Sequence, residues 1–445
     1  MQKNEVYEIE ITGMTEEGDG VGRVNKMAVF VPYTIVGETV RVLIVKVLKH
    51  YAFGKLLEVL KPSIHRVKAE CPYFYQCGGC QLWHMDRDAE LSYKRQKVED
   101  CLLRIGKIDV KPDPTEDAGI MERYRNKAQY PVTPEGIGFY RRNSHQVIPM
   151  TDCKLQGEHD AVVLELIRNW MREENIESYA EENHTGTLRH IYLREGKEEL
   201  LLVLVTRTEE PLSVDGLLKQ IKGKKISVVG IVQNVNDRKT NVVLGKKNLL
   251  LWGRDYLIDS IGDVKFKISP QSFYQVNRFE TEELYRLAGE FAGLTGKETL
   301  WDIYCGIGTI GQFLAKKAGK VIGVEIVPEA VKNAKENAVL NQILNSEYYC
   351  GKAEVLVPKL VEEGEKADVV ILDPPRKGCE ERLLDAVTSV HPKRIVYISC
   401  KPSTLARDLQ YLAKKGYETK KVIPVNMFPR TAHVETVVLL QRQNT

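Results

Sequence analysis

The amino-acid sequence predicts a multidomain chain with an OB-like β-barrel, a central α+β domain and a doubly wound, Rossmann-like α/β domain. Three observations support this prediction. Short strand-like segments separated by glycines fill the first part of the chain, mixed patterns fill the middle, and apolar strands alternate with helical segments from Leu300 onward. The 445 residues exceed a typical single core, since a domain holds roughly 150 residues. We place the domains at residues 1–62, 63–265 and 266–445.

The composition is that of a globular protein, with 43% hydrophobic and 28% charged residues. No apolar run approaches the roughly 20 residues that cross a bilayer, so we expect no membrane partner. The first residues, MQKNEVYEIE, contain acids and lack the apolar stretch of a targeting signal, which favours a cytoplasmic location. The net charge of +3 does not by itself indicate nucleic-acid binding, and the sequence leaves the protein partners unknown.

The first domain is expected to bind RNA. Its strand-like segments are VYEIEITGM, MAVFVPY, ETVRVLIVKVLK and AFGKLLEVL, with glycines in the bend EEGDGVGR. Seven basic residues and one acid, Glu58, occur from Arg41 to Lys68, so the last strands are locally basic. Barrels of the OB type often bind oligonucleotides on one face. The alternative is an ordinary solvated barrel surface.

A cofactor-binding turn is predicted where strand TLWDIY runs into CGIGTIG. Gly306 and Gly308 allow a tight turn and a close backbone approach to a ligand, and Thr309 begins the following helix. The glycine pattern is weak alone, because it also fits nicotinamide enzymes. Glu325 ends the next strand, where a carboxylate can accept hydrogen bonds from ribose hydroxyls. Since no second nucleotide-binding half follows, S-adenosylmethionine is a better candidate than a dinucleotide.

Two further strands of the last domain end in reactive side chains. Asp373 begins the segment DPPR, in which Arg376 replaces the aromatic residue of amino-group methyltransferases and argues against exocyclic-amine chemistry. Strand RIVYISC ends at Cys400 before a helix start, which is expected to lower the thiol pKa. The alternative for such a cysteine is packing in the core. Cys305 and Cys379 are weaker candidates for a nucleophile.

A thiolate at this position suits methylation of a pyrimidine carbon. Carbon 5 of uracil is a poor nucleophile until a group adds to carbon 6 and generates an enolate, which can then attack a sulfonium methyl. A base must finally remove the carbon 5 proton. Glu435 leads the apolar run VETVVLL, where a charge is costly unless it is functional or paired. We therefore expect Cys400 to be the nucleophile and Glu435 the base.

A metal centre is predicted outside the catalytic sheet. Three cysteines form the pattern Cys-x5-Cys-x2-Cys: Cys71, Cys77 and Cys80. Cys153 is the best fourth ligand outside the sheet, and Cys101 is second. The spacing fits a structural zinc or an iron–sulfur cluster, with His84 as a further zinc ligand to consider.

These segments together resemble the RNA (uracil-5-)-methyltransferase family, in particular its 23S ribosomal RNA branch with an N-terminal TRAM domain and a 4Fe-4S cluster. The resemblance rests on GMTEEGDGVGR, CPYFYQCGGC with Cys153, SPQSFYQVN, DIYCGIGTIG, LDPPRKG, YISCKPSTLARDL and HVETVVLL. It implies a structural 4Fe-4S cluster on the four cysteines named above, with Cys400 as nucleophile and Glu435 as base. The cofactor contacts that the resemblance and the glycine turn imply are Gln275, Tyr304, Gly306, Gly308, Thr309, Glu325 and Asp373.

The resemblance implies a structured loop uridine of 23S rRNA as substrate, because the target base must be flipped out of its stack. Lys401 departs from the family, where many relatives have Asn, and its charge could contact phosphate. A transfer-RNA uracil-5-methyltransferase shares the catalytic residues, and only the barrel and the cysteine cluster favour ribosomal RNA. Two further hypotheses are a cytosine-5 RNA methyltransferase and a non-catalytic iron–sulfur RNA-binding protein.

Overall fold

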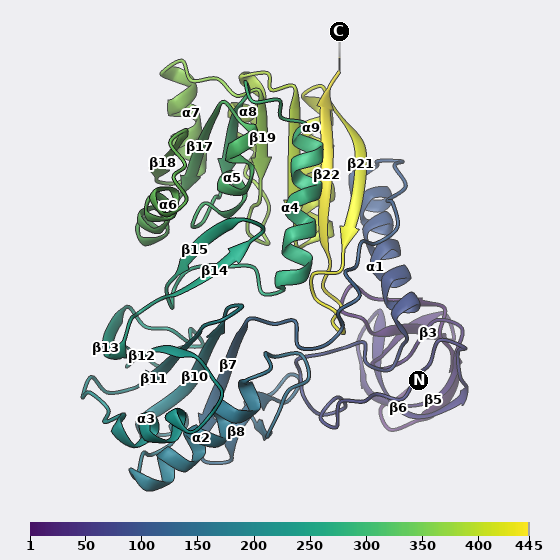
Figure 1. Ribbon diagram of the computed structural model, residues 1–445. Coiled ribbons are helices and arrows are strands. Elements are labelled where there is room, and N and C mark those ends of the chain that lie inside the picture. The colour runs from purple at the N-terminus through teal and green to yellow at the C-terminus, as the bar shows by residue number, and fades with distance from the viewer. Residues whose placement is uncertain (444–445) are drawn as a thin grey trace.

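The N-terminal domain is a curled sheet of six strands, drawn in purple in Figure 1. The computed structural model describes residues 1–443. Alternate side chains along the strands point inward, and Val29, Val42 and Ala52 are fully buried in a small apolar core. The strands, in sheet order, are β1 (Val6–Glu10), β5 (Thr39–Val47), β6 (Tyr51–Lys61), β4 (Met27–Val31), β3 (Gly20–Val24) and β2 (Gly13–Met14).

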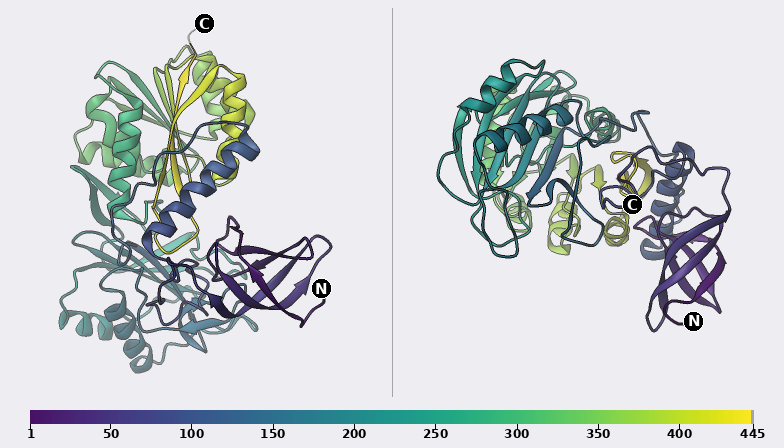
Figure 2. Two further views of the ribbon diagram at one scale, coloured as in Figure 1. Left: turned by 90° about the vertical axis from the view of Figure 1, so that its right-hand side faces the viewer. Right: turned by 90° about the horizontal axis from the view of Figure 1, so that it is seen from below.

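A long helix, α1 (Arg87–Cys101), follows the barrel. Asp86 caps its N-terminus by accepting a hydrogen bond from the backbone N–H of Ala89, and a short π-helical turn, Leu102–Gly106, continues it. The helix lies beside the C-terminal helix and strands, which Figure 2 shows from the side. Residues of α1 therefore contact elements that come more than 300 positions later in the chain.

The central domain is a seven-stranded sheet with two helices, α2 (Asp160–Glu173) and α3 (Asp215–Lys222). Every side chain of the apolar strand LLLVLVT is buried. Leu200, Leu202 and Leu204 pack toward the helices, whereas the alternate residues pack into the core of the C-terminal domain. In sheet order the strands are β13 (Lys247–Gly253), β12 (Val228–Val235), β11 (Leu200–Thr206), β10 (Leu188–Glu195), β7 (Lys127–Thr133), β8 (Gly136–Tyr140) and β9 (Val147–Pro149).

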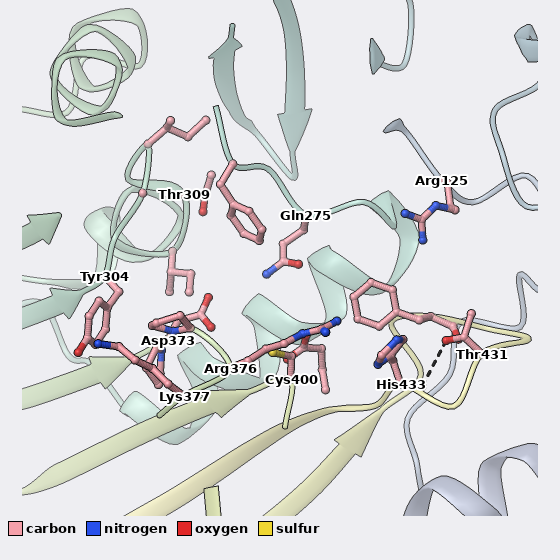
Figure 3. A pocket seen from close by; sticks show the side chains of 18 of the residues that line it. Arg125, Gln275, Tyr304, Thr309, Asp373, Arg376, Lys377, Cys400, Thr431 and His433 are labelled. Carbon is pink, nitrogen blue, oxygen red and sulfur yellow. Dashed lines mark hydrogen bonds between the residues drawn. The ribbon is translucent and has the colours of Figure 1, made fainter. Parts of the chain in front are cut away.

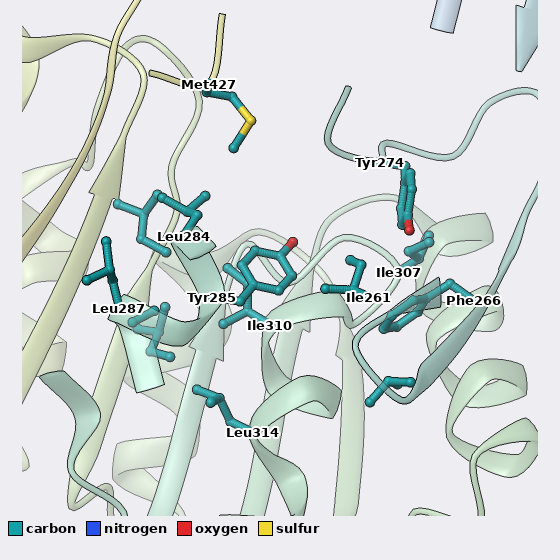
Figure 4. Packing of buried hydrophobic residues seen from close by; sticks show 14 of the residues in the cluster. Ile261, Phe266, Tyr274, Leu284, Tyr285, Leu287, Ile307, Ile310, Leu314 and Met427 are labelled. Carbon is teal, nitrogen blue, oxygen red and sulfur yellow. The ribbon is translucent and has the colours of Figure 1, made fainter. Parts of the chain in front are cut away.

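A hairpin and a helix lead into the C-terminal domain: β14 (Leu257–Ile261), β15 (Val264–Ile268) and α4 (Arg278–Ala292). Asn277 caps α4 by accepting hydrogen bonds from two backbone N–H groups. Figure 4 shows how Tyr285 and Leu284 of α4 pack among residues from the hairpin and from the cofactor turn, such as Phe266 and Ile310. One continuous core thus joins the hairpin, α4 and the C-terminal sheet.

The C-terminal sheet has five parallel strands, followed by an antiparallel pair. Its order is β18 (Ser346–Cys350), β17 (Lys320–Glu325), β16 (Thr299–Ile303), β19 (Val369–Leu372), β20 (Arg394–Ser399), β22 (Glu435–Arg442) and β21 (Tyr417–Val425). The helices that cover it, besides α4, are α5 (Thr309–Leu314), α6 (Pro328–Leu340), α7 (Ala353–Glu362), α8 (Glu381–Ser389) and α9 (Pro402–Lys414). Within residues 1–443 no helix combines the length and apolarity needed to cross a bilayer.

Candidate active site

A cavity of about 950 Å³ opens at the carboxyl ends of the parallel strands and extends to the central domain. This edge is where open α/β sheets bind ligands. Figure 3 shows side chains from both domains that point into the cavity. Most of the expected site residues lie on its wall: Cys71, Cys77, Cys80, Cys153, Gln275, Tyr304, Gly306, Thr309, Glu325, Asp373, Cys400 and Glu435.

The glycine turn after β16 has a left-handed backbone, which glycine adopts without steric cost. Gly306 and Gly308 have φ values of 56° and 81°, and Tyr304 also has a positive φ of 68°. A Cβ on Gly306 would meet nothing within 4 Å, so open space lies above this residue. Asp302, fully buried beneath the turn, accepts a hydrogen bond of 2.8 Å from the N–H of Gly311. The hydrogen bond to Asp302 therefore fixes the buried side of the turn, while the side at Gly306 is open.

Glu325 ends β17 beside this turn. One of its oxygens accepts from the N–H of Gly306 at 3.1 Å, and the other accepts from the N–H of Val327 at 2.9 Å. The carboxylate is therefore fixed in orientation at the end of its strand. The hydroxyl of Tyr304 donates to Glu354 at 2.8 Å, which fixes a second polar group on the same wall.

The segment between β15 and α4 forms another wall of the cavity. Gln275 is 7% exposed, and its backbone carbonyl accepts a 2.8 Å hydrogen bond from the side chain of Asn126. The Thr309 hydroxyl lies 2.7 Å from the Tyr285 hydroxyl, so the start of α5 is tied to α4. Figure 3 shows Gln275 and Thr309 on the side of the cavity away from Cys400.

Cys400 and Glu435 lie at the end of the pairing between β20 and β22. The last paired residues are Ser399 and Thr436, and the two site residues are the next position of each strand. Burial, together with Glu435 and Asp373, raises the pKa of the Cys400 thiol to about 11, while Arg376 opposes this rise. The expectation of a lowered thiol pKa is therefore wrong, because burial and two carboxyl groups outweigh the start of α9.

The two carboxyl groups are perturbed in the same direction. Burial raises the pKa of Glu435 well above its ordinary value, and proximity to Asp373 adds to this effect. Burial also raises the pKa of Asp373 to about 7. Both carboxyl groups are consequently stronger bases than they would be in water. A thiol and two basic carboxyl groups thus share one buried corner of the cavity.

Several cavity residues were not predicted as site residues. Arg376, His433 and Arg125 line the cavity, and Figure 3 shows all three. Burial and the positive charge of Arg376 lower the pKa of His433 to about 4, so the ring is neutral near pH 7. Arg125 has an Nε that is buried without a hydrogen-bond partner among the described residues. The one sequence signal for Arg125 is its place in the segment ERYRNKAQY, residues 122–130, which is rich in Arg, Lys and Tyr.

The four expected metal ligands line the far end of the cavity as free thiols. Burial raises the pKa of Cys153 to about 12, and Cys77 and Cys71 also contribute to the rise. Within residues 1–443, however, no group of three or more His, Cys, Asp or Glu side chains is placed so that it could hold a metal ion. The expected metal centre is therefore not shown by the structure, although the thiols share one wall.

The other two residues considered as ligands have different surroundings. The Cys101 thiol on α1 contacts Glu16 of the barrel at 3.7 Å. The His84 ring lies 3.4 Å from the carbonyl of Thr34 and stacks on Phe74 at 5.7 Å between ring centroids. Neither residue lines the cavity with the four thiols.

Family profiles match two parts of the chain, and relatives match nearly all of it. The profile of the family described as tRNA (Uracil-5-)-methyltransferase matches residues 219–443, and the TRAM domain profile matches residues 1–57. Uncharacterized RNA methyltransferases of Halalkalibacterium halodurans and Clostridium tetani are 49% and 46% identical, over 100% and 99% of this chain and 98% and 97% of their own. The expected N-terminal TRAM domain is therefore confirmed.

One solved structure is similar over nearly its whole length. It is the Pyrococcus abyssi tRNA (uracil-54, C5)-methyltransferase in complex with S-adenosyl-L-homocysteine, with a TM-score of 0.79 and 27% identity. The alignment covers 97% of this chain and 99% of that one. The expected methyltransferase fold of the C-terminal domain is thus confirmed.

Proposed function

The chain belongs to the tRNA (uracil-5-)-methyltransferase family, and we propose that it transfers a methyl group from S-adenosylmethionine to carbon 5 of a uridine in structured RNA. The observation that carries this proposal is the position of Cys400 and Glu435 at the end of one strand pair, in the cavity that contains the glycine turn. Methylation of carbon 5 needs a nucleophile that adds to carbon 6 and a base that removes the proton of carbon 5. The neighbouring positions of Cys400 and Glu435 support these two roles.

S-adenosylmethionine, when bound, supplies an electrophilic methyl group on a sulfonium. Glu325 at the end of β17 is the proposed acceptor for the ribose hydroxyls, and the open space at Gly306, beside Thr309 on the cavity wall, is the proposed place of the ligand. Tyr304, Gln275 and Asp373 complete the proposed cofactor contacts. Gly308 forms the turn without lining the cavity itself, whereas Gly306 and Thr309 lie on the wall.

Cys400 is the proposed nucleophile. Its thiolate forms a bond to carbon 6 of the uracil, and the electron pair of the 5,6 double bond moves into an enolate. Carbon 5 then takes the methyl group, and the sulfonium leaves as a neutral thioether. Glu435 removes the carbon 5 proton, and the returning electron pair restores the double bond and breaks the bond between Cys400 and carbon 6. The thiolate is regenerated and Glu435 holds one proton, which it gives to solvent.

We propose 23S rRNA as the substrate, with residues 1–62 as an RNA-binding barrel and residues 63–265 as a second RNA-binding domain before the methyltransferase domain. The basic strands of the barrel support a role in binding phosphate. Transfer RNA is a second candidate, favoured by the Pyrococcus abyssi structure. Because that tRNA enzyme aligns over 97% of this chain, the presence of a barrel does not separate the two substrates.

We also propose that Cys71, Cys77, Cys80 and Cys153 hold a structural 4Fe-4S cluster. Four free thiols on one wall are the donor set that such a cluster requires, and buried thiols of high pKa are costly to ionise without a cation. No reaction step passes through the cluster. Iron and sulfide analysis of anaerobically purified protein tests the proposal, and a Cys153→Ser variant that retains the full iron content would contradict this ligand set.

The first experiment identifies the product. Anaerobically purified protein is incubated with labelled S-adenosylmethionine and either unmodified 23S rRNA or unmodified tRNA, and the labelled nucleoside is identified after digestion. Cys400→Ala is measured in parallel, with Cys350→Ala as the matched control because Cys350 is exposed and does not line the cavity. Labelled 5-methyluridine that disappears only in Cys400→Ala supports the mechanism. Labelled 5-methylcytidine or no label excludes it, and the RNA that accepts the label decides between the two substrates.

A further inference from the structure

The segment 426–434 joins β21 to β22 and carries side chains of the cavity wall, yet residues from outside the C-terminal sheet hold it. Thr431 and His433 of this loop line the cavity, and Glu435 follows directly. The carbonyl of Pro429 accepts from the Tyr124 hydroxyl at 3.0 Å, and that of Met427 accepts from the Asn277 side chain at 3.1 Å. The conformation of the loop therefore depends on elements from earlier in the chain.

Lys94 on α1 makes the most concentrated set of these contacts. Its ammonium donates to the backbone carbonyl of Phe428 at 3.0 Å and to the side-chain oxygen of Asn426. It also donates to Glu90 at 2.7 Å. The same Glu90 oxygen accepts a 2.9 Å hydrogen bond from the N–H of Arg430. The three protons of the ammonium thus have three acceptors, two of them in the loop.

The side chains of Lys94 and Glu90 are both 0% exposed. A buried ion pair is a poor source of stability, because desolvation of the two charges offsets their attraction and apolar residues of similar volume often stabilise a fold as well. Here, however, the pair also satisfies a backbone carbonyl and a backbone N–H of the loop, which no apolar pair can do. The pair therefore differs from an apolar pair in the hydrogen bonds that it makes to the loop, rather than in how much it stabilises the fold.

We propose that Lys94, together with Glu90, is a positioning residue that holds the loop 426–434 so that Glu435 reaches the carbon 5 proton of the methylated uracil. This inference rests on the proposed function of Glu435. A second lysine on the same face of α1 supports it: Lys97 donates to the carbonyl of Ala432 at 2.9 Å and to the carbonyl of Glu16 in the barrel at 2.7 Å. The two lysines of α1 thus contact the loop 426–434 near its beginning and near its end.

The proposal predicts which step of the reaction depends on Lys94. Addition of Cys400 and transfer of the methyl group need the thiol and the cofactor, whereas the hydrogen bonds of Lys94 go to Glu90, Asn426 and Phe428. Removal of the carbon 5 proton and release of Cys400 need Glu435. A displaced loop should therefore leave a methylated RNA covalently bound to Cys400. Since misplacement of a catalytic group by about 1 Å can cost about 100-fold in rate, we expect a fall of that order in kcat.

The experiment compares Lys94→Met with the double variant Glu90→Gln/Lys94→Met. The single variant leaves a buried unpaired carboxyl group and can lower the Tm, whereas the double variant removes both charges and keeps an acceptor for the N–H of Arg430. Lys332→Met is the matched control, because Lys332 forms an exposed ion pair with Glu336 on α6. For each protein we measure thermal unfolding, the KM for S-adenosylmethionine, kcat with the RNA that accepts the label, and the amount of denaturation-resistant enzyme–RNA adduct.

We expect the double variant to recover the wild-type Tm while kcat stays about 100-fold lower, the KM for S-adenosylmethionine stays within about twofold, and labelled adduct accumulates. Recovery of wild-type kcat in the double variant overturns the proposal and leaves Lys94 a stability role. A lower kcat without adduct also overturns it, because the defect would then precede methyl transfer. If the wild-type protein forms no 5-methyluridine, the proposed function fails and this inference fails with it.

Discussion

Cys400 directly follows Ser399 and Glu435 directly precedes Thr436, and Ser399–Thr436 is the last residue pair of the antiparallel ladder between β20 and β22. Directly opposed residues in such a ladder are about 5 Å apart at their Cβ atoms. The two reactive positions of uracil, carbons 5 and 6, are adjacent ring atoms. The ladder therefore brings the two side chains that we propose as nucleophile and base to neighbouring positions on the cavity wall.

Glu435→Gln should block the last step of the reaction. Glutamine keeps the shape of the side chain but cannot take the carbon 5 proton, and loss of a general base typically costs about 100-fold to 10,000-fold in rate. We expect little 5-methyluridine and a denaturation-resistant, methyl-labelled adduct on gel electrophoresis. Glu418→Gln on the neighbouring strand β21 is the control, because Glu418 is exposed. Normal turnover by Glu435→Gln would remove this residue from the mechanism.

Alkylation of Cys400 should be slow near neutral pH and accelerate as the pH rises. Since burial, Glu435 and Asp373 raise the pKa of its thiol to about 11, the thiolate fraction should rise about tenfold per pH unit below that value. Iodoacetamide labelling followed by peptide mass spectrometry measures the rate at this site. Glu435→Gln should shift the profile to lower pH, because it removes a carboxyl group that opposes ionisation. A rate that is independent of pH would contradict the raised pKa.

Asp302→Asn should stabilise the fold increasingly as the pH rises from about 4 to above 7. Burial raises the pKa of Asp302 to about 7 from an unfolded value near 3.8, so the folded state binds the proton more tightly than the unfolded state does. The stability that this group contributes is complete below the unfolded pKa and is lost as the pH rises through 7. One pKa unit corresponds to about 1.4 kcal/mol, so Asn should gain up to about 4 kcal/mol at high pH.

Chemical denaturation of the wild type and Asp302→Asn on both sides of this pH window checks the prediction. Asparagine keeps an oxygen for the N–H of Gly311, so the two proteins should have similar free energies of unfolding at low pH. A difference that does not grow with pH would show that the buried carboxyl group is not protonated in the folded state.

Gly308→Ala should weaken binding of S-adenosylmethionine. Gly308 has φ of 81°, and an added Cβ would lie 2.6 Å from the side-chain nitrogen of Gln312 and 3.1 Å from the Tyr348 ring. Gly364→Ala is the matched control, because Gly364 has a φ of 88° but nothing within 4 Å of its Cβ position. We expect both variants to lose about 1 kcal/mol of stability from the backbone. Calorimetry should show weaker cofactor binding only for Gly308→Ala.

The sequence was most informative where function depends on local patterns. The glycine turn, the strand ends at Glu325, Asp373 and Cys400, and the barrel all follow from spacing along the chain, and the carboxyl edge of a parallel sheet brings the strand ends together. The raised pKa of Cys400 could not be predicted in this way. It depends on Glu435, a neighbour of Cys400 in space across the β20–β22 pairing rather than in sequence.

The long-range packing of α1 could not be predicted from the sequence either. The residues of α1 are mostly polar and form no apolar stripe that would show which surface the helix covers. Its contacts with the loop 426–434 cross more than 300 residues. Arg125 and His433 were missed as site residues for the same reason, since each reaches the cavity from an element whose position depends on the assembled fold.

Strand β11 is buried on both of its faces, and this restricts how the central sheet can move relative to the catalytic sheet. Leu201, Val203 and Val205 belong to the same core as the methyltransferase sheet, while their neighbours along the strand belong to the core beneath α2 and α3. A slip of one residue would exchange these two faces, so the strand cannot slide and the central sheet cannot hinge freely against the catalytic sheet. Under the proposed function, the RNA rather than the protein must therefore bend to bring a uridine to Cys400.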